Sequence, residues 1–406
     1  MLKYKTYAPV VDPTIPFLGT PPQAPSKLTR GYQICTKTIM DTSDPGIVFD
    51  ENGTSDYYHN YKEVIEPTWH TDERGREVLM RTAEKIRKDG RNRDFDCIMG
   101  LSGGLDSSYA IYIVKEVMGL RPLAFHVDAG WNTRQAVSNI EKLLNGLGLD
   151  LYTDVIDWEE MKDLQRSYFK AGHPNQDDPQ DIAFFSGLYR FARKHKIKYV
   201  LTGANYSTEC CREPEPWGAY PGIDRTLALD IHRRFGEGTL RSFPIVDILT
   251  YKLYYKYVLG MQVFKPLNLV PYIKEDAERE LYERFGWEKF QHKHHESRFT
   301  RFYEDYWLPR RFGFQKRRAH FSSLVLTGQM TRDEALERVS RPEMSEEFLE
   351  NEFEYVAHKL DFTTDEFRAL FNAPKRTYHD FRNKRPLIGV GARAMRLLGL
   401  EKRLFR

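Results

Sequence analysis

At 406 residues the chain is long enough for two or three domains, and 41% hydrophobic with 29% charged residues is the composition of a globular protein in water. The net charge of +3 is too small to demand general affinity for nucleic acid, so we expect no nucleic-acid partner. No segment reaches about 18 uninterrupted apolar residues, which predicts a cytoplasmic chain that is neither secreted nor membrane-spanning.

The first quarter of the chain predicts an arm and a small module. Residues 1–30 are rich in proline and are expected to form an extended arm, because proline removes backbone donors and forbids helix. Residues 31–93 predict a β-ribbon with a turn at Asn52-Gly53, followed by a helix. The expected strands are residues 32–36 and 46–50, and the expected helix is residues 74–88.

Residues 94–274 alternate between strand and helix patterns. This alternation predicts an α/β domain with a doubly wound parallel sheet, whose ligands lie beyond the carboxyl ends of the strands. The expected strands are residues 96–101, 122–127, 151–156 and 199–202, and the expected helices are residues 105–117, 133–147, 159–170 and 182–194.

A phosphate-binding loop follows the first of these strands. Two adjacent glycines allow a tight turn that brings backbone N–H groups to an anion, and serine hydroxyls surround the start of the next helix. The residues expected to hold ATP here are Ser102, Gly103, Gly104, Asp106, Ser107 and Ser108. A carboxylate at Asp106 would repel phosphates unless a divalent cation bridged them, so Mg²⁺ is implied. The dipeptide Gly-Lys is absent from the chain, which disfavours a Walker A loop.

Other strand ends should meet the same edge of the sheet. Val127 and Asp128 follow the second strand and Gly203 follows the fourth, so we expect them beside the nucleotide. Backbone near Met99 and at residues 125–127 is the expected neighbourhood of the adenine.

The last part of the chain, residues 275–406, predicts a helical region. Thr331 with Glu334, and Thr363 with Glu366, have capping-box spacing ahead of helices. No internal repeat accompanies these helices.

The loop Ser102–Ser108 resembles the S-G-G-x-D-S motif of the PP-loop ATP pyrophosphatases. The resemblance implies that the loop holds the outer two phosphates as a leaving group. It also implies attack at the α-phosphate, which yields an adenylylated substrate, with Asp106 and Ser102 as catalytic residues.

A more specific resemblance extends over residues 31–340, to the N-acetyl sugar amidotransferases of bacterial surface polysaccharide synthesis. The matching blocks are residues 202–209, 294–302, 317–320 and 328–332, together with the phosphate loop. That family typically carries two C-x-x-C pairs in its N-terminal module, whereas this chain keeps Cys35 and has Thr38, Ser55 and Tyr58 in the other three positions. One thiolate cannot hold a tetrahedral zinc, so we expect structural zinc to be absent.

The matching blocks also supply candidate substrate residues. A histidine run flanked by basic residues suits an acidic substrate better than a metal, and clustered guanidinium groups can grip a diphosphate or carboxylate. The candidates are Asn205, Glu209, His294, His295, Arg298, Arg317 and Arg318.

The resemblance implies conversion of an acetamido group on a nucleotide-linked sugar to an acetamidino group, in O-antigen or other surface glycan synthesis. The chain lacks the N-terminal cysteine or cysteine elbow of a glutaminase, so its ammonia is expected from a separate glutaminase through a barrel-shaped ammonia-conducting subunit. A tRNA-thiolating enzyme is one alternative, although it needs a usable cysteine pair among Cys35, Cys97, Cys210 and Cys211. A non-catalytic ATP-binding scaffold of a polysaccharide complex is the other.

Overall fold

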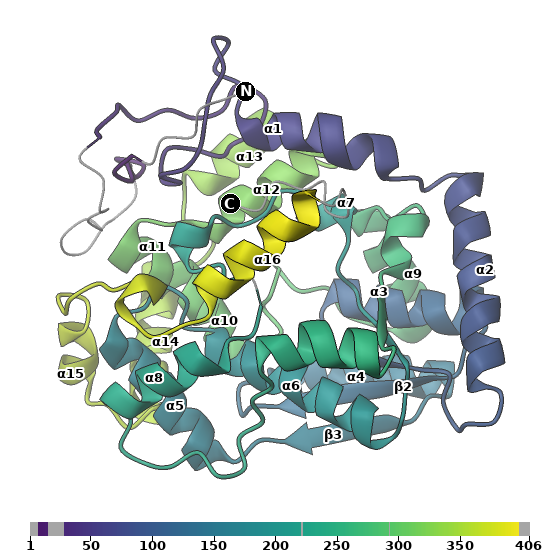
Figure 1. The fold of residues 1–406 in the computed structure, drawn as a ribbon. Helices are drawn as coiled ribbons and strands as arrows, with labels where there is room; N and C mark the ends of the chain where they lie inside the picture. Colours follow the sequence, from purple (N-terminus) through teal and green to yellow (C-terminus); the bar gives the residue numbers. More distant parts are fainter. Residues whose placement is uncertain (1–6, 15–27, 221, 292, 398–406) are drawn as a thin grey trace.

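The fold is built on five parallel strands in the order β3-β2-β1-β4-β5, as seen in a computed structural model that describes residues 7–14, 28–220, 222–291 and 293–397 (Figure 1). β1 lies at the centre, with Met99 opposite Ala124 of β2 and Leu201 of β4. The predicted doubly wound α/β architecture is therefore confirmed. The strands are β1 (Cys97–Gly100), β2 (Pro122–Asp128), β3 (Leu151–Val155), β4 (Tyr199–Leu201) and β5 (Gln262–Phe264).

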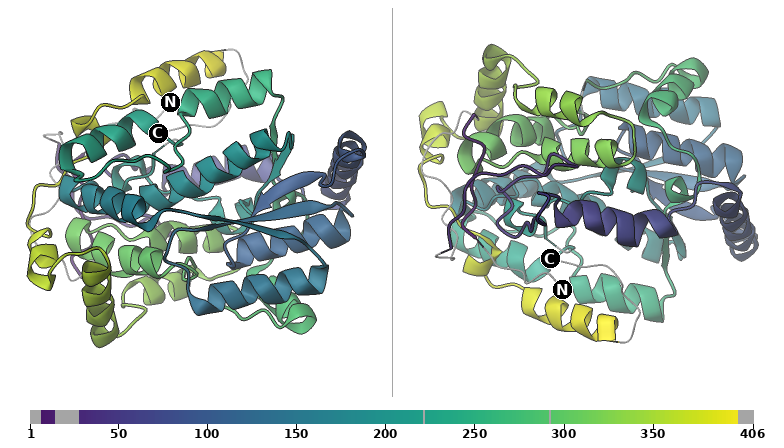
Figure 2. Two further views of the ribbon diagram at one scale, coloured as in Figure 1. Left: turned by 90° about the horizontal axis from the view of Figure 1, so that it is seen from below. Right: turned by 90° about the horizontal axis from the view of Figure 1, so that it is seen from above.

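Helices cover both faces of this sheet, as the two turned views in Figure 2 show. Side chains alternate between the faces along β1, so Ile98 packs with one set of helices while Cys97 and Met99 pack with the other. The first set is α5 (Trp158–Ala171), α6 (Asp178–Lys194) and α8 (Arg225–Phe235). The second set is α2 (Glu73–Gly90), α3 (Leu105–Tyr112), α4 (Arg134–Leu147) and α9 (Lys274–Phe285).

Several predicted elements differ in detail. The helix expected at 105–117 ends its α-helical part at Tyr112 and continues as a π-helical turn, Ile113–Val117. The helix expected to begin at 182 begins at Asp178, one turn earlier. The sequence reading missed β5, the short α7 (Tyr206–Glu209), α8 and the π-helix η5 (Thr250–Val258).

The predicted β-ribbon is the main correction. Among the described residues of the N-terminal module there are two isolated antiparallel bridges, Ile34 with Asp41 and Phe49 with Ser55, in place of paired strands. Turns replace paired strands because side-chain oxygens accept the hydrogen bonds of backbone N–H groups. For example, Oδ1 of Asp50 accepts from the N–H groups of Asn52 and Thr54 at 2.9 and 2.8 Å. Of the proline-rich arm, residues 1–6 and 15–27 lie outside the described part. The module continues into α1 (Asp56–Asn60).

The C-terminal helices enclose an aromatic core. Phe299, Trp307 and Phe353 are fully buried within it. These helices are α10 (Arg298–Phe302), the π-helix η7 (Tyr303–Trp307), α11 (Leu308–Phe312), α12 (Lys316–Leu326), α14 (Glu346–Lys359) and α15 (Thr364–Ala369). Two further helices of this region, α13 (Arg332–Val339) and α16 (Arg385–Leu397), lie outside this core. Thr363 completes the predicted capping box with Glu366.

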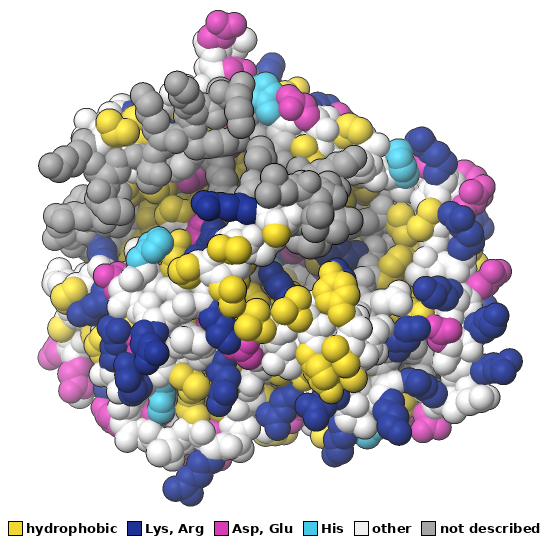
Figure 3. Space-filling view, in the orientation of Figure 1, with side chains coloured by type: hydrophobic (Ala, Val, Ile, Leu, Met, Phe, Trp, Pro, Cys, Tyr) yellow, Lys and Arg dark blue, Asp and Glu magenta, His cyan; other side chains and the backbone are white. Residues whose placement is uncertain are grey.

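One face of the molecule carries exposed apolar side chains from η5 and α16, which lie side by side in Figures 1 and 2. They include Leu253, Tyr257, Val258, Leu387 and Val390. Figure 3 shows hydrophobic side chains gathered in this region. In the described part of the chain, no helix combines the length and the apolar character needed to cross a bilayer.

Candidate active site

The loop Ser102–Ser108 connects β1 to α3 at the carboxyl edge of the sheet. Gly103 adopts φ +84°, and a Cβ there would stand 2.6 Å from the carbonyl oxygen of Ala136, so glycine is required. The indole N–H of Trp287 donates to the Gly103 carbonyl at 3.3 Å, which fixes the turn from a distant segment. The hydroxyl of Ser108 is buried without a hydrogen-bond partner. The loop is therefore held in a tight turn at the end of β1, with Ser102 and Ser107 on the cavity and Ser108 behind them.

Asp106 stands in the first turn of α3 and is held by several side chains, Thr208 among them. The hydroxyl of Tyr272 donates to its Oδ1 at 2.5 Å, Nδ2 of Asn205 donates to the same oxygen at 3.2 Å, and Nζ of Lys293 lies 3.0 Å from Oδ2. Burial alone would raise the pKa of this carboxyl, but the charge of Lys293 and these donors hold the pKa below its ordinary value. Asp106 is thus an anion at neutral pH.

The ends of the neighbouring strands meet the loop as expected. Gly203 packs so closely that a Cβ would lie 2.7 Å from the carbonyl carbon of Asp106. Asn205 caps α7 and bonds to Asp106, whereas Val127 lines the adjoining cavity. Asp128 does not line the cavity, because its carboxylate accepts from Gly130 N–H at 2.8 Å within the turn after β2. Met99 is fully buried under the helices that cover its own face of β1.

Glu296 is a residue of this site that the motif did not reveal. Its Oε1 accepts a hydrogen bond from the hydroxyl of Ser102 at 3.2 Å. The same carboxylate packs so closely against Gly104 that a Cβ on that glycine would stand 2.7 Å from Oε1. The backbone around it is anchored, because Thr133 N–H donates to the Glu296 carbonyl at 3.0 Å. A carboxylate of this chain therefore rests against the phosphate loop.

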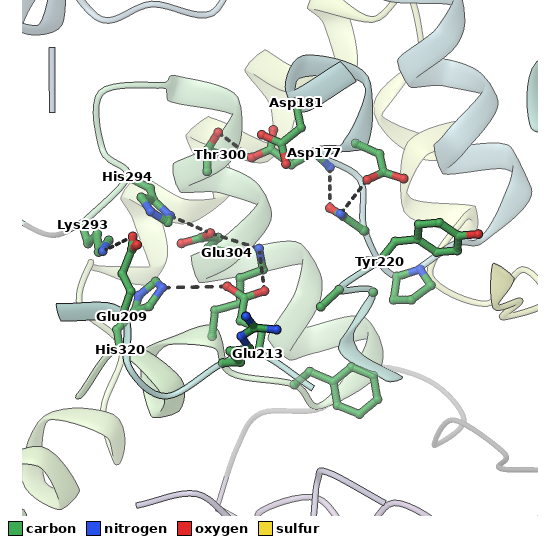
Figure 4. A pocket seen from close by; sticks show the side chains of 18 of the residues that line it. Asp177, Asp181, Glu209, Glu213, Tyr220, Lys293, His294, Thr300, Glu304 and His320 are labelled. Atoms are coloured by element: carbon green, nitrogen blue, oxygen red, sulfur yellow. Dashed lines mark hydrogen bonds and ion pairs between the residues drawn. The ribbon is translucent and has the colours of Figure 1, made fainter. Parts of the chain in front are cut away.

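A network of charged side chains extends from the loop (Figure 4). Lys293 bridges Asp106 to Glu209, 2.7 Å away, and the next residue, His294, lies 3.1 Å from Glu304. Burial would lower the pKa of His294, but the carboxylate of Glu304 raises that pKa to about 9. His294 is therefore a cation at neutral pH.

Lys316 continues the network from the first turn of α12. Its Nζ lies 3.2 Å from Glu213 and 3.4 Å from Glu304. Burial opposes the charge, yet these carboxylates hold the pKa of Lys316 well above its ordinary value. His320, one turn further, has its pKa lowered by burial and by the charge of His294. A fixed cation and a neutral imidazole thus stand side by side.

Three carboxylates at the start of α6 face these groups and are called the acidic wall: Asp177, Asp178 and Asp181. Asp177 accepts from the Thr300 hydroxyl at 2.9 Å, and Asp178 accepts from Nδ2 of Asn175 at 2.9 Å. Asp181 opens onto the cavity, and no described residue donates a hydrogen bond to its carboxylate. Asp181 is exposed to solvent at the cavity, and its partly desolvated surroundings and the carboxylates of Asp177 and Asp178 raise its pKa above the ordinary value. Burial also raises the pKa of Asp178 to about 7.

One cavity of about 2150 Å³ joins the phosphate loop, the charged network and the acidic wall. Its floor is the carboxyl edge of the sheet, and its far side comes from residues 293–380. The sequence signals that could have pointed to the added residues are Asp177-Asp178 with Asp181 ahead of a helix, and Lys293 and Glu296 within the histidine run. Lys316 and Tyr272 carry no recognisable motif.

Several predicted substrate residues have structural partners instead. Arg298 pairs with buried Glu352 at 2.6 Å, and Arg318 is 1% exposed and pairs with Asp12 and Asp41. Neither lines the cavity, so their assignment to the substrate is corrected.

The other predicted basic residues also include some that line the cavity and some that do not. His295 is buried, 3.0 Å from Asp305, and does not line the cavity. Arg317 does line it, although its guanidinium is 3.1 Å from Glu343. His294 and Glu209 are the predicted residues that the structure brings to the charged network.

All four cysteines are buried and reduced. The Cys35 sulfur accepts from backbone N–H groups of Lys37, Thr38 and Ser55 at 3.2–3.4 Å, so this thiol holds together the turns at the start of the N-terminal module. Burial raises the pKa of Cys97 far above its ordinary range. Cys210 and Cys211 are adjacent and buried, so no exposed thiol pair offers itself for sulfur transfer.

The central β1, the Ser-Gly-Gly-Leu-Asp-Ser loop after it and the cavity above the strand ends define an α/β protein with a glycine-rich loop at the carboxyl edge of a parallel sheet. Residues 296–395 match the model of the family described as LPS biosynthesis protein WbpG-like, C-terminal domain. Over these residues the match supports the resemblance to proteins of surface polysaccharide synthesis.

Among solved structures, the chain is similar to NMN synthetase from Francisella tularensis (15% identity, TM-score 0.34, 72% of this chain and 96% of that chain). It is also similar to the U34-tRNA thiolase NcsA from Methanococcus maripaludis (18%, 0.32, 68% and 80%). The NH3-dependent NAD synthetase from Campylobacter jejuni is matched over 33% of this chain and 58% of its own length (16% identity, TM-score 0.26). TM-scores this low say nothing about activity. No curated protein matches the chain.

Proposed function

We propose that this protein is an ATP-dependent amidotransferase that converts the acetamido group of a nucleotide-linked sugar to an acetamidino group in surface glycan synthesis. One observation carries the proposal. The loop Ser102–Ser108, with its own carboxylate and no Gly-Lys dipeptide, opens onto a large cavity whose far wall comes from the WbpG-like domain.

The chemistry follows from the substrate. An amide carbonyl is a poor electrophile, so its oxygen must first become a leaving group. The acetamido oxygen attacks the α-phosphorus of ATP, the bond to the β-phosphate bridge breaks and pyrophosphate leaves. Ammonia then attacks the imidate carbon, the carbon–oxygen bond breaks, and AMP and a proton leave. The loop holds pyrophosphate, so its contacts lower the barrier of the first step.

The residues present fit ATP and Mg²⁺. The loop offers N–H groups and the hydroxyls of Ser102 and Ser107, while Asp106 offers an ionised carboxylate to a hard cation. A bound Mg²⁺ supplies charge neutralisation between Asp106 and the phosphates. Lys293 stands 3.0 Å from Asp106 and adds a fixed positive charge at this edge of the site.

The acidic wall suits the second step. An attacking ammonia must lose a proton, and a base is most effective when its pKa lies near the working pH. Asp181, with an open carboxylate and a pKa raised by its surroundings and by Asp177 and Asp178, accepts that proton. Lys316 and the protonated His294 stabilise the negative charge of the departing AMP. The nitrogen comes from a separate glutaminase through an ammonia-conducting barrel subunit.

The test is pyrophosphate release with ATP, ammonium and candidate UDP-N-acetyl sugars. We expect AMP and pyrophosphate in equal amounts, and Asp106→Asn to lower the rate by about 10²- to 10³-fold. The exposed Asp94 provides a matched control, Asp94→Asn, which should leave the rate unchanged. ADP and orthophosphate as products would contradict the proposal, and so would an unaffected Asp106→Asn variant.

A further inference from the structure

The π-helix η5 carries apolar side chains on its outer side as well as on its inner side. Leu253, Tyr257 and Val258 are 53, 62 and 69% exposed. Tyr255, between them in the sequence, is 2% exposed and packs against Tyr189 of α6, with the ring centroids 5.9 Å apart. A helix that is apolar all round is normally buried on every side. Packing against the core therefore explains only one side of η5.

The neighbouring helix α16 also presents apolar side chains to solvent. Leu387 and Val390 are 50 and 62% exposed, and the exposed Ala394 follows at helical spacing on the same side. A Cβ on Gly391 would meet nothing within 4 Å. The apolar stripe of α16 thus faces away from the protein, which is the reverse of an ordinary surface helix.

Ion pairs fix the start of α16 beside η5. Lys384, just ahead of α16, pairs with Asp247, which lies just ahead of η5. Arg385 pairs with Glu215, with Nε and Oε1 2.5 Å apart. The two helices lie side by side in Figures 1 and 2, so their outer side chains form one apolar patch. No residue of η5 or α16 lines the active-site cavity.

The sequence around this apolar patch is basic. Residues 248–274 contain four lysines, residues 381–397 contain five lysines and arginines, and neither stretch has an aspartate or a glutamate. The net charge of the whole chain is only +3, so the excess is local. Lys256 and Arg393 are exposed, and Nζ of Lys256 lies 5.0 Å from the centre of the Tyr257 ring. Figure 3 shows Lys and Arg side chains bordering the hydrophobic ones.

We propose that η5 and α16 bind the surface of an acidic lipid bilayer. Aliphatic side chains enter the boundary between head groups and acyl chains, and tyrosine suits this boundary because its ring is apolar and its hydroxyl is polar. The cations come from two helices without accompanying carboxylates, so the partner must offer negative charge over the whole patch, as acidic head groups do. The bilayer site lies outside the cavity and does not depend on the proposed reaction.

Sedimentation of the full chain with lipid vesicles tests the proposal. Vesicles of phosphatidylcholine with one quarter phosphatidylglycerol are compared with vesicles of phosphatidylcholine alone. We expect binding to the acidic vesicles to be stronger by about tenfold and to weaken in high salt. Val258→Glu should weaken binding by about tenfold or more, because it replaces an inserted apolar group by a charge of the wrong sign. Lys256→Glu should weaken binding to the acidic vesicles by about tenfold and leave binding to the neutral vesicles unchanged.

Val155 provides a matched control, because it is 71% exposed and lies on β3, at the opposite edge of the sheet from β5. Val155→Glu should bind vesicles as the parent does, and thermal unfolding checks that each variant is folded. Absent binding, equal binding to both kinds of vesicle, or equal losses in Val258→Glu and Val155→Glu would overturn the proposal. A dimer that Val258→Glu dissociates, in a chain that ignores vesicles, would overturn it too and assign the patch to a second copy.

Discussion

Replacing Gly203 by alanine is the sharpest probe of how the phosphate loop is supported. The backbone of Gly203 itself permits alanine, because its φ is not in the left-handed region. The added Cβ, however, would stand 2.7 Å from the carbonyl carbon and oxygen of Asp106 and 2.8 Å from the Ser107 nitrogen. All three are backbone atoms of the loop, so no rotamer change can relieve the contact.

The size of the effect follows from that distance. An ordinary contact of about 3.4 Å requires the two segments to separate by about 0.7 Å, the difference between 3.4 and 2.7 Å. Overpacking of this kind costs about 1–3 kcal/mol. A displacement near 1 Å at a reacting centre typically costs about 10²-fold in rate. We expect Gly203→Ala to lower pyrophosphate release by that order and to weaken ATP binding.

Titration calorimetry with ATP and a pyrophosphate-release assay measure the two effects. Gly31 has nothing within 4 Å of the position of a Cβ, so Gly31→Ala is the control for a generic glycine substitution. Thermal unfolding of both variants separates loss of the site from loss of the fold. A Gly203→Ala protein that binds ATP and releases pyrophosphate at the parent's level would refute this account of the loop.

Three further outcomes are expected. Arg298→Met should lower the free energy of unfolding by about 1.5–3 kcal/mol, because it removes a charged hydrogen bond to buried Glu352. The affinities for ATP and UDP should not change. A loss of affinity at unchanged stability would restore Arg298 to the substrate site. The pKa of His294 is raised from 6.5 to about 9, so its stabilising contribution is complete below about pH 6.5 and is lost as the pH rises through 9. Urea unfolding at several pH values should show this decline, and His294→Gln should flatten it; identical slopes would contradict the charge pairing. Zinc chelation should leave the thermal midpoint unchanged, because Cys35 is the one cysteine at the four positions Cys35, Thr38, Ser55 and Tyr58, whereas a lowered midpoint with zinc found by metal analysis would show a site built from other ligands.

The sheet could be predicted because its signals are local. A buried strand, a glycine-rich turn and an amphipathic helix follow one another within about twenty residues around Ser102, and the same pattern repeats at β2. β5 was missed because it is three residues long and partly exposed, and it becomes a strand only by pairing with β4. Its existence depends on a neighbour rather than on its own composition.

The residues of the site also differ in whether a local sequence pattern reveals them. The loop residues share one motif, whereas Tyr272 reaches Asp106 across 166 residues of sequence and Glu296 reaches Ser102 across 194. Arg298 and Arg317 offer the same chemistry in the sequence, and only burial and pairing distinguish a structural cation from one that faces the cavity. Such contacts are decided by tertiary packing, which a single sequence does not encode in any local pattern.

The clamp around Arg318 has a consequence for how the chain is made. Its guanidinium, buried deep in α12, is neutralised by Asp41 and by Asp12, which lies 306 residues earlier in the chain. During synthesis the two aspartates emerge from the ribosome long before their partner does. The N-terminal module can therefore make these ion pairs only after about three quarters of the polypeptide has been translated, so its docking onto α12 depends on the late part of the chain.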